Sequence, residues 1–230
     1  MMTMPTMSEL IRDTDTGLAW RVVQPAPTTP TALLVLLHGV GGNETQLAHL
    51  AATAGKDVLV VLPQGRLAFG PGQFGWFRVA FTPNGPQIQP EEAEASRTAL
   101  IRWVERLQRE HGIAPARTVI AGFSQGGIMS ASVGLTAPER VAGFGVLSGR
   151  ILPELETLLA PAESLRNVRG FIGHGMHDGK LPVAWAERAD AWLTQLGVEH
   201  ATRLYPIDHT ISPAMQADFE AWYHSLLGKV

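Results

Sequence analysis

A serine set between closely spaced glycines is the feature of this sequence that most directly indicates chemistry. Gly122-Phe123-Ser124-Gln125-Gly126 follows an apolar run, Thr118–Phe123, and opens a helical pattern over Ser124–Ala137. Between a strand and a helix, Gly-x-Ser-x-Gly forms a nucleophile elbow that holds the serine hydroxyl above the edge of a sheet. Glycine is needed beside the serine because side chains would collide in so tight a turn. The alternative is an ordinary strand–helix turn in which Ser124 caps the helix.

A serine nucleophile requires a base, and the base requires an acid to orient it. In proteins with a nucleophile elbow, the serine comes first along the chain, the acid second and the histidine third. Asp178 follows the apolar run Arg169–Gly173, and His209 follows the next run, Ala201–Tyr205. Because catalytic groups gather at the carboxyl ends of parallel strands, we expect Ser124, Asp178 and His209 to meet at one edge of a sheet.

Neighbouring residues offer alternatives to this assignment. Asp208 adjoins His209, but adjacent side chains usually diverge, so Asp178 is the preferred acid. His174, His177 and Asp178 could indicate a metal site, yet catalytic zinc needs three protein ligands and no further ligand cluster accompanies them. We therefore expect no metal. The remaining histidines are expected to be surface or structural residues: His38, His49, His111, His200 and His224.

A second glycine-rich turn, His38-Gly39-Val40-Gly41-Gly42, follows the apolar run Ala32–Leu37. Such a turn lets backbone N–H groups point into a site without obstruction by side chains. An oxyanion hole needs two donors, one just after the nucleophile and one from a loop of this kind. The natural pair is the N–H groups of Val40 and Gln125. The alternative is a phosphate-binding loop, but neither Gly-x-x-x-x-Gly-Lys nor Gly-x-Gly-x-x-Gly occurs here.

The elements that must position these residues alternate along the chain. Two runs, Leu33–Leu37 and Val58–Leu62, are apolar throughout, which is typical of strands covered on both faces in a parallel sheet. Repeated strand–helix alternation predicts an α/β fold, a three-layer α/β/α sandwich with a mostly parallel central sheet. The expected strands are Ala19–Gln24, Ala32–His38, Val58–Leu62, Thr118–Phe123, Val141–Leu147, Arg169–Gly173 and Ala201–Tyr205. The expected helices are 43–54, 91–110, 124–137, 183–196 and 214–227, the first with Asn43 as cap and Gln46 completing a capping box.

The longest segment without a predicted element is Pro63 to Gln89, which is rich in Gly, Pro and aromatic residues. Its aromatic content argues for packing over disorder. Trp76, Phe77 and Phe74 are therefore candidates for an apolar wall of a substrate pocket, with ordinary packing of a long loop as the alternative. Because α/β folds of ~250 residues often form one domain, we expect residues 1–230 to be a single domain.

Composition narrows the class of protein. Of the 230 residues, 17% are charged, and the formal net charge is −3. The dense positive charge of a nucleic-acid-binding protein is therefore absent, and this charge gives no reason to expect binding to an anionic membrane surface. Without cysteine there is no disulfide, thiol nucleophile or Cys-ligated zinc. The first eight residues lack the basic and apolar regions of a signal peptide, and the longest apolar run falls far short of the ~20 residues that span a bilayer. We expect a cytoplasmic protein without a membrane span.

Taken together, the motifs resemble those of the phospholipase/carboxylesterase family of α/β-hydrolases, which includes bacterial carboxylesterases and acyl-protein thioesterases. The resemblance rests on Leu36-Leu37-His38-Gly39, Gly122-Phe123-Ser124-Gln125-Gly126-Gly127, Leu147-Ser148-Gly149, His174-Gly175-x-x-Asp178 and His209. The glycine-rich turn at His38 is closer to the bacterial esterase branch. The resemblance implies the α/β-hydrolase fold and a serine esterase without cofactor. It also supports the triad Ser124, Asp178 and His209 and the oxyanion donors Val40 and Gln125.

The sequence thus predicts hydrolysis of a small-molecule carboxylic ester, of short or medium acyl chain, through an acyl-enzyme on Ser124. One alternative is a thioesterase or lysophospholipase that cleaves another acyl bond by the same steps. Another is a catalytically silent binding protein, which is disfavoured because each expected triad residue is present. The physiological substrate and the oligomeric state are not encoded in any of these patterns.

Overall fold

The elements lie close to where the sequence places them. The computed structural model describes residues 5–82 and 85–228. Its strands are β1 (Thr6–Met7), β2 (Ile11–Arg12), β3 (Ala19–Gln24), β4 (Ala32–Leu37), β5 (Val58–Gln64), β6 (Leu67–Gly70), β7 (Gln73–Gly75), β8 (Val79–Thr82), β9 (Gly85–Ile88), β10 (Thr118–Phe123), β11 (Gly143–Leu147), β12 (Arg169–Gly175) and β13 (Glu199–Tyr205). Its α-helices are α1 (Pro90–His111), α2 (Gln125–Thr136), α3 (Ala162–Leu165), α4 (Ala184–Leu196) and α5 (Pro213–Leu227), and four short 3-10 turns, η1 (Ala48–Ala51), η2 (Pro115–Arg117), η3 (Pro138–Arg140) and η4 (Pro153–Leu158), join them.

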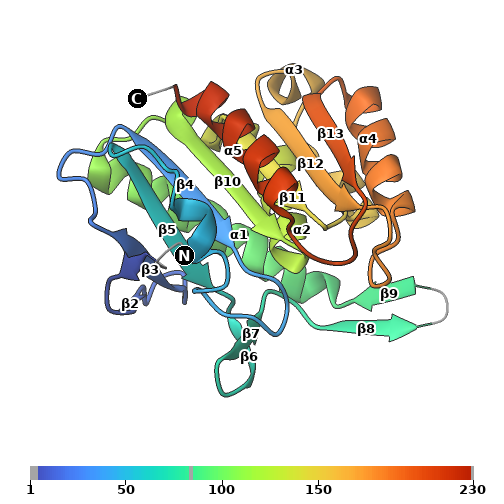
Figure 1. The fold of residues 1–230 in the computed structure, drawn as a ribbon, viewed down its shortest axis with the longest axis horizontal. Coiled ribbons are helices and arrows are strands. Elements are labelled where there is room, and N and C mark those ends of the chain that lie inside the picture. Colours follow the sequence, from blue (N-terminus) through green and yellow to red (C-terminus); the bar gives the residue numbers. More distant parts are fainter. Residues whose placement is uncertain (1–4, 83–84, 229–230) are drawn as a thin grey trace.

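In the described ranges, nine strands form one central sheet in the order β1-β3-β5-β4-β10-β11-β12-β13, with β2 beside β3 (Figure 1). The strands from β5 through β13 in that order pair in parallel, whereas β3 pairs antiparallel with its neighbours. All parallel strands therefore end at the same edge of the sheet. The loops that follow β4, β10, β12 and β13 meet there.

Helices cover both faces of this sheet because its central strands are apolar on both. In β4, Leu33, Val35 and Leu37 face a core shared with α1, α2 and α4. The alternate residues Leu34 and Leu36 face a second core built from α5 and the segment around η1. Figure 1 shows α5 in front of the sheet and α1 and α2 behind it. The prediction of a three-layer α/β/α sandwich with a mostly parallel sheet is confirmed.

The helix predicted over residues 43–54 is wrong, since the structure has only the single 3-10 turn η1 there. Asn43 and Gln46, which were expected to form a capping box, make other hydrogen bonds. The Asn43 carboxamide oxygen accepts a hydrogen bond from the N–H of Thr45, two residues on, and so closes a local turn. The Gln46 carboxamide oxygen accepts from the N–H of Gly39, at 2.7 Å, instead of returning to Asn43.

The segment from Pro63 to Gln89 is more regular than predicted. It continues β5 to Gln64 and then forms two antiparallel hairpins, β6–β7 and β8–β9. The first hairpin turns at Gly70-Pro71-Gly72, where Gly72 has a φ of 68°. The high glycine and proline content that made this segment resemble a loop belongs to its turns and short strands.

Smaller differences concern the ends of elements. Strand β13 begins at Glu199, two residues earlier than predicted, and β11 begins at Gly143, two residues later than predicted. The short strands β1 and β2 add to the antiparallel side of the sheet and were not predicted. Across the described residues, no helix combines the length and apolar character required to cross a bilayer.

Candidate active site

Ser124 lies at the turn between β10 and α2 with φ 52° and ψ −116°, a conformation that side-chain-bearing residues rarely adopt. Two glycines make the turn possible. A Cβ on Gly122 would lie 2.3 Å from the backbone carbon of Gly126, and one on Gly126 would lie 2.0 Å from the carbonyl oxygen of Leu37. The backbone approaches itself too closely for side chains, so the serine is held at the sheet edge in a fixed direction.

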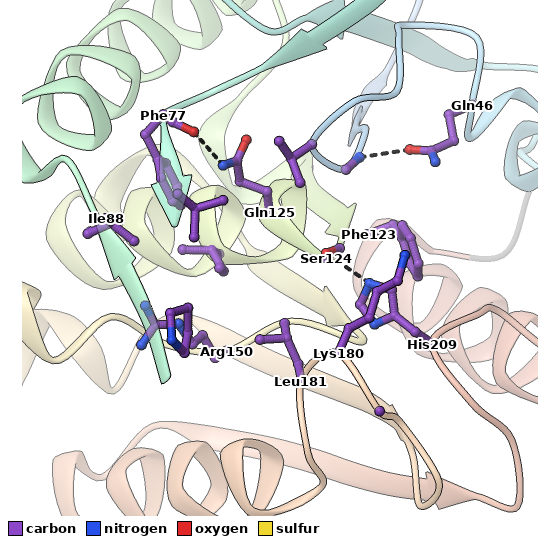
Figure 2. Close-up of a pocket in the computed structure, with 16 residues that line it drawn as sticks. Gln46, Phe77, Ile88, Phe123, Ser124, Gln125, Arg150, Lys180, Leu181 and His209 are labelled. Carbon is purple, nitrogen blue, oxygen red and sulfur yellow. Dashed lines mark hydrogen bonds between the residues drawn. The ribbon is translucent and has the colours of Figure 1, made fainter. Parts of the chain in front are cut away.

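The structure brings the three predicted triad residues together, and Figure 2 shows two of them, Ser124 and His209, joined by a dashed line. His209 Nδ1 lies 2.7 Å from Asp178 Oδ2, and His209 Nε2 lies 3.0 Å from Ser124 Oγ. A carboxylate only accepts hydrogen bonds, so the imidazole proton lies on Nδ1. Nε2 is then free to accept the hydroxyl proton of Ser124, which is the geometry of a general base beside a nucleophile.

Asp178 is buried and its carboxylate is fully hydrogen-bonded. Its Oδ1 accepts from the backbone N–H groups of Lys180 and Leu181, at 2.9 and 2.8 Å, while its Oδ2 faces His209. These bonds fix the orientation of the carboxylate. The alternative acid, Asp208, is exposed, and no hydrogen bond joins its carboxylate to another described residue.

Two further histidines at this edge are buried. His38 lies between the carbonyl oxygen of Gly39 and the N–H of Gly65, and burial lowers its pKa. His174 Nε2 lies 2.7 Å from the carbonyl oxygen of Leu181, and burial likewise lowers its pKa. Both imidazoles support loops of the site. Across the described ranges, no group of three or more His, Asp or Glu side chains is placed to hold a metal ion.

The two predicted oxyanion donors are positioned beside the serine. Gln125 is the first residue of α2, so its N–H has no acceptor within the helix, and the N–H of Val40 has none among the described residues. The Val40 loop is fixed by β7, because the N–H of Gly41 donates to the carbonyl oxygen of Phe74 and the N–H of Phe74 donates to that of Gly42, both at 2.8 Å. Two free N–H donors therefore lie at the rim of the site.

Ser124 and His209 open into a cavity of about 490 Å³, a volume typical of small-molecule sites. The cavity is lined mainly by apolar side chains, among them Phe77, Val79 and Ile88. Of the three predicted wall residues, Phe77 lines the cavity. Trp76 does not, because it points into the core, where its indole N–H donates to the carbonyl oxygen of His38 at 2.9 Å. Phe74 pairs with Gly42 through its backbone and does not line the cavity either.

Several residues that face the cavity were not identified from the sequence. Gln46, Arg150, Lys180 and Leu181 all line it. Gln46 was assigned to a helix cap, although its position seven residues after Gly39 is the one signal that could have linked it to the glycine-rich loop. Arg150 follows the Ser148-Gly149 pair, and Ser148 has a positive φ of 50°, a second strained serine at a strand end.

The sheet order, the strained serine turn and the order of the three loops define an α/β-hydrolase. The model of the phospholipase/carboxylesterase family matches residues 18–224. The chain belongs to this family and is a hydrolase of the esterase or thioesterase type.

Similar proteins carry both kinds of name. The chain is 26% identical over 219 residues to an acyl-protein thioesterase 1 of Emericella nidulans, covering 86% of this chain and 91% of the relative. It is 26% identical over 223 residues to the Gibberella zeae protein of the same name, covering 90% and 95%. A solved carboxylesterase of Mesorhizobium loti superposes with a TM-score of 0.78 at 24% identity, covering 94% of this chain and 98% of that one.

Proposed function

We propose that this protein hydrolyses carboxylic esters through an acyl-enzyme on Ser124. His209 removes the hydroxyl proton as Ser124 attacks the ester carbonyl, and it returns that proton to the departing alcohol. Asp178 orients His209 and stabilises its charged form. The N–H groups of Val40 and Gln125 bind the oxyanion of the tetrahedral intermediate. Water, activated by His209, then releases the acid and restores Ser124.

The observation that carries this proposal is the hydrogen-bonded series Ser124–His209–Asp178 at the end of an apolar cavity. Each of the three side chains comes from a different loop at the same sheet edge. The two distances are those expected for a serine nucleophile hydrogen-bonded to its base and for a base hydrogen-bonded to an orienting acid. A binding protein without activity would have no need of a serine held in a strained turn within hydrogen-bond distance of an imidazole.

The cavity also supports a substrate of short or medium acyl chain. Its volume is about 490 Å³, and its apolar lining includes Phe77, Val79, Ile88, Ile128 and Leu181. Such a lining binds an acyl chain by removing apolar surface from water, at roughly 0.8 kcal/mol per buried CH₂ group. We therefore expect kcat/KM to rise with chain length and then to fall once the cavity is filled.

Cleavage of an acyl-thioester is the second candidate, and the names of the fungal relatives favour it. The same nucleophile, base and oxyanion donors would act on a thioester. A panel of p-nitrophenyl esters of increasing chain length, measured beside acyl-thioesters of matched acyl groups, separates the two candidates. Higher kcat/KM for the oxygen esters across the series would support the esterase proposal. A consistent preference for thioesters would identify the protein as a thioesterase instead.

The nucleophile is tested with a fluorophosphonate, which should add one covalent label at Ser124. The Ser124→Ala variant should lose both the label and ester hydrolysis, and peptide mass spectrometry locates the label. Asp208→Asn serves as the matched control, because it changes an exposed residue beside His209. Labelling of Ser124→Ala at the wild-type rate would contradict the proposal.

A further inference from the structure

Arg150 is a buried cation in the wall of the cavity, and no partner neutralises it. Its side chain is only 4% exposed, and it is one of the residues that line the cavity. Across the described residues, its guanidinium makes no ion pair and no hydrogen bond. Arginines are almost never buried unless they are paired, because a buried charge is costly without a counter-charge. An unpaired one in a binding cavity therefore points to a ligand that supplies the counter-charge.

The guanidinium is held in place by its surroundings. Its central carbon lies 4.7 Å from the centroid of the Trp185 ring, on which Arg188 also stacks, at 4.9 Å. Arg150 lies two residues after Ser148, which has a positive φ of 50° at the end of β11. Burial lowers the pKa of Arg150, an effect that the exposed Glu154 opposes from a distance, yet arginine keeps its proton in proteins. The cavity wall thus contains a fixed positive charge with donors free to bind.

The rest of the lining reinforces this charge. The residues of the described chain that line the cavity include Arg150 and Lys180 but no Asp or Glu. Lys180 is exposed at the rim, in the loop of the predicted acid. Figure 2 shows Arg150 set apart from Ser124 and His209, with Leu181 between them. An anion bound to Arg150 would therefore be separated from the reacting carbonyl by an apolar chain.

We propose that the substrate is an ester with a carboxylate at the far end of its organic chain, and that Arg150 binds this carboxylate. Arginine suits this role because its planar donors match the two oxygens of a carboxylate. The inference rests on the proposed function, since it names the class of ester that the Ser124 site accepts. The distal carboxylate takes no part in bond breaking. Hydrolysis consumes one water and gives a carboxylic acid and an alcohol, one of which keeps the distal carboxylate. Arg150 is a specificity-determining residue and not a catalytic one.

The test compares esters that differ only in the distal group. Mono-p-nitrophenyl esters of adipate, suberate and sebacate are measured against p-nitrophenyl hexanoate, octanoate and decanoate, and kcat/KM is compared at equal carbon number. In the wild type we expect at least one anionic ester to be preferred by about tenfold or more. Arg150→Met should reduce that ratio to one or less, and Arg150→Lys should give an intermediate ratio because the charge stays but the planar donors are lost.

Arg188→Met is the matched control. It removes a guanidinium from the other contact with Trp185, but Arg188 does not line the cavity, so the wild-type preference should persist. A second series places the carboxylate on the alcohol side, comparing the butyrate ester of ω-hydroxyhexanoate with hexyl butyrate by titration of the released acid. A preference in one series identifies the side of the ester that reaches Arg150. No preference for the anionic ester in either series, or the same ratio in Arg150→Met as in the wild type, overturns the inference.

Failure of this inference and failure of the proposed function give different results. Hydrolysis of the neutral esters that depends on Ser124, without preference for a carboxylate, rejects only the role of Arg150. If Ser124→Ala hydrolyses all esters as fast as the wild type, the proposed function fails. Binding of a carboxylate at Arg150 is then tested without catalysis, by the effect of adipate on the Tm. Adipate should raise the Tm of Ser124→Ala and leave that of Ser124→Ala/Arg150→Met unchanged. Equal shifts in both proteins overturn the carboxylate site itself.

Discussion

The loops after β10, β12 and β13 and the hairpin segment 65–89 face the same cavity, but they are built differently. In the loops, polar side chains are buried and hydrogen-bonded, as Asp178 is to two backbone N–H groups and His209. The hairpin segment offers mainly apolar side chains to the cavity and carries exposed residues such as Phe69. The proposed chemistry therefore belongs to the sheet edge, whereas the shape of the cavity depends on a segment outside the main sheet.

One residue joins the two regions. The side chain of Gln125 donates to the carbonyl oxygen of Phe77 and accepts from the N–H of Trp76, both at 2.7 Å. Ser96 on α1 adds a hydrogen bond to the carbonyl oxygen of Trp76. The hairpin segment is thus fixed at its centre, at Trp76 and Phe77, to the same residue whose backbone N–H is a proposed oxyanion donor.

The largest effect, a loss of kcat, should come from substitution of Asp178 at the sheet edge. Conversion of a catalytic Asp to Asn can reduce kcat by ~10⁴, as in serine proteases, because the imidazole then holds the wrong tautomer. We expect Asp178→Asn to lower kcat by several orders of magnitude, and the exposed Asp208→Asn to lower it by about tenfold or less. Steady-state kinetics of both variants, with circular dichroism to check folding, ranks them. The reverse ranking would assign the acid to Asp208.

Removing the two side-chain hydrogen bonds of Gln125 should destabilise the attachment of the hairpin segment to the sheet edge. Gln125→Met keeps the backbone N–H and most of the side-chain volume, but it leaves the N–H of Trp76 and the carbonyl of Phe77 buried without partners. Each such group costs roughly 1–3 kcal/mol, so for two groups the free energy of unfolding should fall by ~2–6 kcal/mol. Urea unfolding measures this loss. A variant with wild-type stability would mean that the hairpin segment does not depend on Gln125.

Changes confined to the hairpin should alter selectivity more than chemistry. Ile88 is half-buried and lines the cavity from β9. Ile88→Phe should move the optimum of the p-nitrophenyl ester series to shorter chains, with a loss of roughly 1–2 kcal/mol in apparent binding of the longest esters. The acetate ester should be affected least. An equal loss on every chain length would show that Ile88 supports the site without bounding it.

The smallest effect should be the response to acid, which differs between the regions. Segment 65–89 contains no His, Asp or Glu, whereas the sheet edge holds the buried His38 and His174, whose pKa values are lowered by burial. Because the unfolded chain binds protons on these histidines more readily, stability should fall as pH drops below ~6.5, by at most ~1.4 kcal/mol per pH unit for each. Urea unfolding at neutral and mildly acidic pH measures the slope. His174→Asn should reduce it, and the exposed control His111→Asn should not.

The sequence was informative where a local pattern determines position. Strand and helix periodicity placed Ser124, Asp178 and His209 at strand ends, and parallel pairing alone brings such ends to one edge. Gln46 and Arg150 could not be placed in the same way, because their contacts depend on how distant loops pack. Trp76 and Phe77 show the limit most clearly. They are adjacent aromatic residues with equal sequence signals, and only the packing of the folded chain decides that Phe77 faces the cavity and Trp76 the core.

The backbone pairing between Gly41, Gly42 and Phe74 has a consequence for how relatives of this chain can diverge. It makes residues 73–75 part of the support of the Val40 N–H, so an insertion there would shift a donor of the site. The tip of the same hairpin, Gly70-Pro71-Gly72, does not pair with the backbone of the Val40 loop, and its contact there is the exposed hydrogen bond from the Asn43 carboxamide to the carbonyl oxygen of Gly72. Surface turns of this kind tolerate added residues at little loss of free energy. Length variation in this segment should therefore collect at the tip, a few residues from a stretch where it is not tolerated.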